Sequence, residues 1–331
     1  MGQARKANLD SMATRPRPIL NQIIGPLGVA AALGMLLVLI MGATVTSTGS
    51  AQGCARDWPL CRGQFIPQFT VSTLIEFSHR AVTAVESLLI FALAAAALAL
   101  WRSRRTVILL VTLMLTSLFV QAGMGAAAVK WPQQPVVLAL HFGISLVALA
   151  ATALTAAYVR HPERRRTPQS DSRGLAWAAW GALAYIYLLV YSGALISHTG
   201  AAQACTSWPG CTSGAPMAGY FRLLDLGHRL AAGGAIFIAL GLILIARRCR
   251  PERPHLVRAA IWFLATLGLQ AVAGVVLVLS HFDLFGELLH SGVTGVVFVA
   301  ASYVCFLVAV GDPAASPGAV GARSGVLENA R

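Results

Sequence analysis

Hydrophobic positions form eight long runs along the chain, separated by short polar stretches. Each run exceeds the roughly 20 residues that a helix needs to cross the hydrocarbon core of a bilayer. Inside that core a helix satisfies its own backbone hydrogen bonds. The runs cover residues 24–45, 73–100, 106–129, 136–159, 174–196, 223–246, 259–282 and 288–311. We therefore predict an all-α integral membrane protein with eight transmembrane helices.

Composition and charge support this prediction and add an orientation. Of the 331 residues, 57% are hydrophobic and 11% are charged, whereas about 25% of the residues of soluble domains are charged. Most of the 25 Lys and Arg residues lie in the two tails and in the connections that follow even-numbered runs. The positive-inside bias then predicts a cell (plasma) membrane protein with both termini in the cytoplasm. This topology accounts for the net charge of +13, so we expect no nucleic-acid partner.

The chain also repeats itself. The segment after the first run and the segment after the fifth run share the order Thr-Gly, Cys, Trp-Pro, Cys. We predict two tandem four-helix bundles, related by a pseudo-two-fold axis along the membrane normal because each half crosses an even number of times. The expected divisions are a cytoplasmic tail at 1–19, a first half at 20–160, a cytoplasmic linker at 161–173, a second half at 174–310 and a disordered cytoplasmic tail at 311–331.

Four histidines follow the same repeat. The interval from His79 to His228 equals the interval from His141 to His290. All four lie near the predicted outer end of a run, and histidines inside a membrane are costly and mark functional sites. Two facing imidazoles at one depth suit the axial ligation of a haem iron. A lone histidine near a span end is more often an interfacial residue, but a matched set of four favours two haem sites. His161 and His255 in cytoplasmic connections, and His198 and His281 in external loops, are predicted to be solvated.

Charged residues lie next to these histidines. Glu76 is one helical turn outward from His79 on the same face, and a carboxylate beside a haem edge can accept or deliver protons. The alternative is a structural carboxylate that binds a loop. Arg80 and Arg229 directly follow histidines and are candidate partners for haem propionates, although arginines at such positions also extend to the membrane surface. Glu86, two turns deeper, suggests a proton relay.

Two cysteine pairs lie in predicted external loops. Cys54 and Cys61 follow the first run, and Cys205 and Cys211 follow the fifth. Each pair faces an oxidising space and can close a small ring, so we predict two disulfides. Each disulfide is either a staple over a haem site or, for the first pair, a redox-active bond. A zinc site is disfavoured because neither loop adds a second cluster of ligands.

These motifs resemble the haem A synthase family, also called CtaA, over residues 20–310. The resemblance rests on Thr-Ser-Thr-Gly before Cys54, on Trp58-Pro59 and Cys61, on Glu76-x-x-His79-Arg80, and on the second copy around His228-Arg229. Members convert haem O to haem A by oxidising a methyl group of the porphyrin to a formyl group. The resemblance implies that His79 and His141 hold the substrate haem beside a catalytic Glu76. It also implies that His228 and His290 hold a resident haem b for electron transfer.

The resemblance further implies partners. They are the lipid bilayer, haem O, the haem O synthase that supplies it, and a redox partner that the sequence does not identify; a homo-oligomer is left open. Two alternatives come from other classes of protein. A quinol-linked cytochrome subunit would use the four histidines with haem b but would not need Glu76. A repeat-built transporter would place broken helices and polar residues at the membrane midplane, whereas here the polar residues gather at the outer rim.

Overall fold

The described part of the chain is built from helices. The computed structural model describes residues 18–68, 70–131, 134–162, 173–212, 214, 219–249 and 253–311. The long helices are α2 (Pro18–Ser47), α3 (Val71–Trp101), α4 (Arg105–Lys130), α5 (Pro135–Arg160), α6 (Arg173–His198), α7 (Gly219–Cys249), α8 (Pro254–Leu279) and α9 (Leu284–Val310), and two short 3₁₀ helices are η1 (Ser50–Gln52) and η2 (Ala201–Ala204). All eight long helices are long and apolar enough to cross a membrane, which confirms the eight predicted spans.

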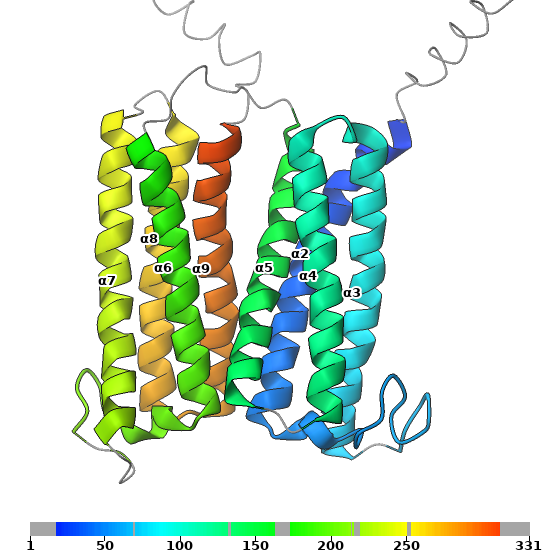
Figure 1. Cartoon of the computed structure of the whole chain (residues 1–331), viewed down its shortest axis with the longest axis vertical. Coiled ribbons are helices and arrows are strands. Elements are labelled where there is room, and N and C mark those ends of the chain that lie inside the picture. Colours follow the sequence, from blue (N-terminus) through cyan, green and yellow to red (C-terminus); the bar gives the residue numbers. More distant parts are fainter. Residues whose placement is uncertain are drawn as a thin grey trace, which may run out of the picture.

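The helices pack in the same pattern in each half of the chain. Helix α2 contacts α3 and α5, and α4 contacts α3 and α5; in the same way, α6 contacts α7 and α9, and α8 contacts α7 and α9. Helices α5 and α2 also contact α9, and α5 contacts α6. In Figure 1 these two groups of four helices stand side by side. The pseudo-two-fold axis stays a prediction.

Small residues allow the helices to approach closely, as is common in membranes. A Cβ atom placed at Gly28 of α2 would lie 3.0 Å from the Cα atom of Ala156 in α5. Between the two groups, a Cβ atom at Gly295 of α9 would lie 2.9 Å from Leu39 of α2 and 3.0 Å from Leu149 of α5. The contact between α2, α5 and α9 therefore depends on a residue without a side chain.

The segments that follow α2 and α6 lie at one end of the molecule, which we call the loop end (Figure 1). Helices α3, α5, α7 and α9 all begin at this end. Thr70 caps α3, since its hydroxyl accepts a hydrogen bond from Thr73 N, and the Thr73 hydroxyl donates to Gly53 O at 2.8 Å. The start of α3 is therefore tied to the preceding loop.

Two arginines join helices at the opposite end. Arg104, the N-cap residue of α4, donates to Pro162 O at 2.6 Å, and buried Arg253, the N-cap residue of α8, donates to Leu307 O at 2.5 Å. The two arginines occupy corresponding positions of the repeat, although the carbonyl groups that they bind do not correspond. The expected tails lie almost wholly outside the described residues, as does most of the linker at 161–173.

Candidate functional site

The first histidine pair lies near the loop end between α3 and α5. His79 and His141 are close enough to interact electrostatically, and both are half-buried. A Cβ atom at Gly42 of α2 would lie 3.5 Å from His79 Cε1, and one at Gly125 of α4 would lie 3.9 Å from His141 Cε1. Each imidazole therefore faces a helix backbone that carries no side chain at that point.

The second pair repeats this arrangement on α7 and α9. His228 and His290 also interact electrostatically. A Cβ atom at Gly193 of α6 would lie 2.7 Å from His228 Cε1, and one at Gly274 of α8 would lie 3.5 Å from His290 Cε1. The structure thus brings together both pairs that the sequence predicted. Iron binding by either pair stays a prediction.

Each pair supplies two imidazoles, which is the donor set of a haem iron with two axial histidines. The Nδ1 atoms of His79 and His141 are buried and have no hydrogen-bond partner among the described residues. In the part of the chain that the structure describes, no group of three or more His, Cys, Asp or Glu side chains could hold a metal ion. Two protein ligands are fewer than a structural zinc needs, but they match the axial positions of an iron whose other ligands come from a porphyrin.

A glutamine on the neighbouring helix holds the second histidine of each pair. Gln121 of α4 donates to His141 O at 2.8 Å and also contacts Ser145. Gln270 of α8 lies 3.1 Å from His290 Nε2 and donates to Thr294 Oγ1 at 2.7 Å. The two glutamines at matching positions therefore bind α5 and α9 at the turn that carries the histidine.

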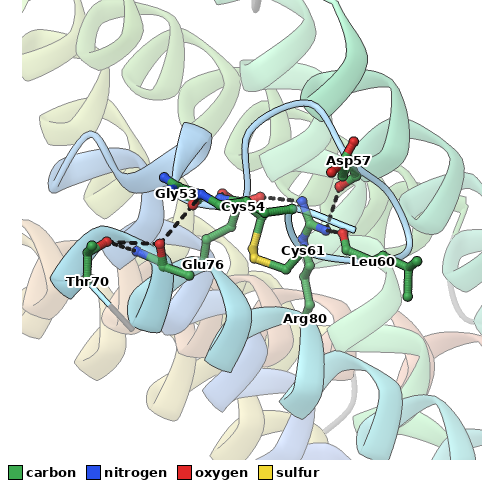
Figure 2. Close-up of a disulfide and its surroundings, with 10 residues drawn as sticks. Gly53, Cys54, Asp57, Leu60, Cys61, Thr70, Glu76 and Arg80 are labelled. Atoms are coloured by element: carbon green, nitrogen blue, oxygen red, sulfur yellow. Dashed lines mark hydrogen bonds and ion pairs between the residues drawn. A yellow bond between two sulfur atoms is a disulfide. The ribbon is translucent and has the colours of Figure 1, made fainter. Parts of the chain in front are cut away.

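Glu76 is held by the first cysteine loop (Figure 2). Its side chain is buried, with the residue only 3% exposed. Glu76 Oε2 accepts a hydrogen bond from Cys54 N at 2.8 Å, and Oε1 forms an ion pair with Arg80. In the second half the equivalent amide, Cys205 N, donates instead to Ala202 O. The loop alternative that the sequence left open for Glu76 is therefore seen in the structure, and a catalytic role remains compatible with it.

Arg80 and Arg229 both bind the cysteine loops. Arg80 Nη1 donates to Asp57 O at 2.8 Å and to Leu60 O at 2.9 Å (Figure 2). Arg229 donates to Cys205 O at 2.8 Å and to Ser207 O at 2.7 Å, and it pairs with Asp225. Each arginine thus fastens a loop to the helix that carries a candidate ligand. Pairing of either arginine with a haem propionate stays a prediction.

Comparison with known proteins identifies the family of the chain. Residues 27–302 match the model of the COX15-CtaA family, described as cytochrome oxidase assembly protein. The chain belongs to this family. It is 37% identical over 286 residues to "Heme A synthase" of Symbiobacterium thermophilum, covering 82% of this chain and 91% of the relative. It is 34% identical over 296 residues to proteins of the same name from Bacillus cereus and Bacillus anthracis, covering 88% of this chain and 94% of each relative.

Both predicted disulfides are present in this member of the COX15-CtaA family. Cys54 is joined to Cys61, and Cys205 to Cys211, with Cα atoms 4.5 Å and 4.8 Å apart. The first disulfide closes the loop that binds Glu76, as Figure 2 shows. Redox activity of this bond stays a prediction. Cys305 is buried and is not part of a disulfide.

Sequence reasoning missed two polar residues near the histidines. His198, predicted to be solvated in a loop, is the half-buried last residue of α6 and is close enough to His141 to interact electrostatically. The prediction was wrong because α6 continues two residues beyond the apolar run that ends at Ile196. Ser192 lies 3.1 Å from His228 Nδ1. Ser192 directly precedes Gly193, whereas Met41 precedes Gly42 in the first half. This difference between the two halves was the signal in the sequence.

Glu86 lies deeper in α3 and is 2% exposed. Neither carboxylate oxygen has a hydrogen-bond partner among the described residues, and a Cβ atom at Gly34 of α2 would overlap Glu86 Oε2. In the second half the large side chain comes from the other helix: Tyr185 stands where the first half has Gly34, and Ala235 stands where it has Glu86. Glu86 therefore fills space that an apolar side chain could fill, and the proton relay remains a hypothesis.

Proposed function

We propose that this protein is a haem A synthase, an oxidoreductase that oxidises a methyl substituent of haem O to the formyl group of haem A for cytochrome oxidase. The observation that carries the proposal is the match, over most of the chain, to curated haem A synthases in a fold that repeats a histidine pair. These matches favour the enzyme over a cytochrome subunit that only transfers electrons. The transporter alternative has no support from them.

We assign the substrate to the first half. His79 and His141 would hold the iron of haem O, which supplies the oxidation chemistry when bound. Glu76 is the candidate catalytic residue, because its carboxylate lies one turn from His79 and is held by Cys54 N and Arg80. A carboxylate fixed in this way can take up a proton at Oε1 or Oε2 as the substrate methyl group is oxidised. Asp225, one methylene shorter, occupies this position in the second half.

We assign a resident haem b to the second half, between His228 and His290, where it would pass electrons to or from the first site. The repeated contacts among helices support two tandem four-helix bundles, and the matching positions of the histidines in the repeat support two sites at one depth. The positive-inside bias supports cytoplasmic termini and haem sites toward the external face, with the loop end outside. The haem O synthase, a redox partner and a homo-oligomer are the partners that we expect beyond the bilayer.

The test is expression with and without a supply of haem O, followed by extraction and identification of the haems. We expect haem A only with haem O, and we expect Glu76→Ala to abolish its formation while haem b is retained. Asp225→Asn is the matched control and should leave haem A formation in place. Unchanged turnover in Glu76→Ala would remove the catalytic assignment, and a purified protein without haem would contradict the proposal as a whole.

A further inference from the structure

The two candidate haem sites differ in what holds their first histidine. In the second half, Ser192 Oγ lies 2.7 Å from Leu189 O and 3.1 Å from His228 Nδ1. A hydroxyl group has one proton to donate, and here it goes to the Leu189 carbonyl. Ser192 Oγ must therefore accept a hydrogen bond from His228 Nδ1–H. This contact fixes the tautomer in which His228 Nε2 is unprotonated and has a lone pair for a metal ion.

The first half has no such contact. Met41 takes the place of Ser192, directly before Gly42 as Ser192 is directly before Gly193. A thioether sulfur is only a weak acceptor. His79 Nδ1 is buried and has no hydrogen-bond partner in the described ranges. The tautomer and orientation of His79 are therefore not fixed by a neighbouring side chain in the way that those of His228 are.

We propose that Ser192 is a positioning residue that locks His228 for permanent haem retention, and that Met41 leaves His79 unlocked so that the haem in the first half can exchange. This inference rests on the proposed function, which requires one haem to stay and the other to enter as haem O and leave as haem A. Partners of a ligating imidazole typically change metal affinity by about 10- to 100-fold. A difference of this size in haem affinity would allow one site to keep its haem while the other, with the same pair of ligands, releases it.

The test uses the full-length protein in detergent and two reciprocal variants, Ser192→Ala and Met41→Ser. Release of haem b is followed spectroscopically in the presence of excess apomyoglobin as a haem acceptor. We expect Ser192→Ala to speed the release of haem b by about 10-fold or more and Ser192→Thr, which keeps a hydroxyl, to restore slow release. We expect Met41→Ser to slow the release of haem O loaded into the first site.

A second readout separates positioning from a merely structural role. A hydrogen bond from Nδ1–H makes the imidazole a stronger electron donor to iron, so Ser192→Ala should raise the reduction potential of haem b without changing the helical content. Equal release rates and potentials in wild type and Ser192→Ala would overturn the inference while leaving the proposed function intact. Wild-type protein that holds no haem b would instead contradict the proposed function itself.

Discussion

Glu76 Oε2 accepts a hydrogen bond from the backbone N–H of Cys54, 2.8 Å away, so the candidate catalytic carboxylate binds the backbone of a residue that forms a disulfide. Arg80 also holds the loop between Cys54 and Cys61, because it donates to the backbone carbonyl groups of Asp57 and Leu60 and forms an ion pair with the Glu76 side chain. The position of the carboxylate therefore depends on the loop, and the loop depends on the Cys54–Cys61 bond.

We predict that replacing Cys54 and Cys61 together by serine slows haem A formation by about 10-fold or more, since a displacement of about 1 Å at a reacting group can cost about 100-fold. Haem b content should not change. The matched control replaces Cys205 and Cys211, whose loop binds Arg229 and has its Cys205 amide bonded to Ala202 O. That control should affect retention of haem b more than turnover. Equal turnover in the first double variant and wild type would show that the loop does not position Glu76.

A second prediction concerns Glu86, a buried carboxyl group whose oxygens have no partner among the described residues. An unsatisfied buried polar group costs about 1–3 kcal/mol, so Glu86→Leu should increase the free energy of unfolding by a similar amount. The change is seen as a higher thermal midpoint in detergent. Glu86→Gln keeps a polar group and should gain less. Lower stability in Glu86→Leu would mean that the carboxyl group has a partner, and unchanged turnover in Glu86→Gln would remove the proton-relay hypothesis.

A third prediction tests the contact between the two groups of helices. Gly295→Leu should lower the free energy of unfolding by about 1–3 kcal/mol, because the new side chain would overlap Leu39 and Leu149. Gly181→Leu is the matched control, since a Cβ atom there meets nothing within 4 Å. Thermal unfolding of both variants in detergent measures the difference. Equal thermal midpoints for Gly295→Leu and Gly181→Leu would show that packing at Gly295 does not hold α2, α5 and α9 in contact.

A fourth prediction concerns pH. The N–H of Gly286 donates a hydrogen bond to Asp283 Oδ1 at 2.7 Å, and this bond and the nearby Ser280 hydroxyl lower the pKa of the Asp283 carboxyl group, which caps α9. A lowered folded-state pKa gives stability that is present above the unfolded pKa and is lost as pH falls through the folded pKa. The thermal midpoint of Asp283→Ala should therefore be below that of wild type at neutral pH, with a difference that shrinks on acidification. A constant difference would contradict this.

Much of the fold follows from the sequence, because length and hydrophobicity decide where a chain can cross a bilayer. The run predicted at 73–100 is helix Val71–Trp101, and His79 and His141, which the repeat predicted to be a pair, are close enough to interact electrostatically. Contacts made by loops and by single atoms were not predictable in this way. Binding of Arg80 to Asp57 O, and of Cys54 N to Glu76, depends on how a loop folds back over a helix, and hydropathy carries no information on that.

In the proposed function one chain holds two haems with different roles. The most direct measurement is the haem content of protein purified from cells without haem O, for wild type, His79→Ala and His228→Ala. We predict one haem b per chain in wild type and in His79→Ala, and none in His228→Ala. Loss of haem b from His79→Ala together with its retention in His228→Ala would contradict the account.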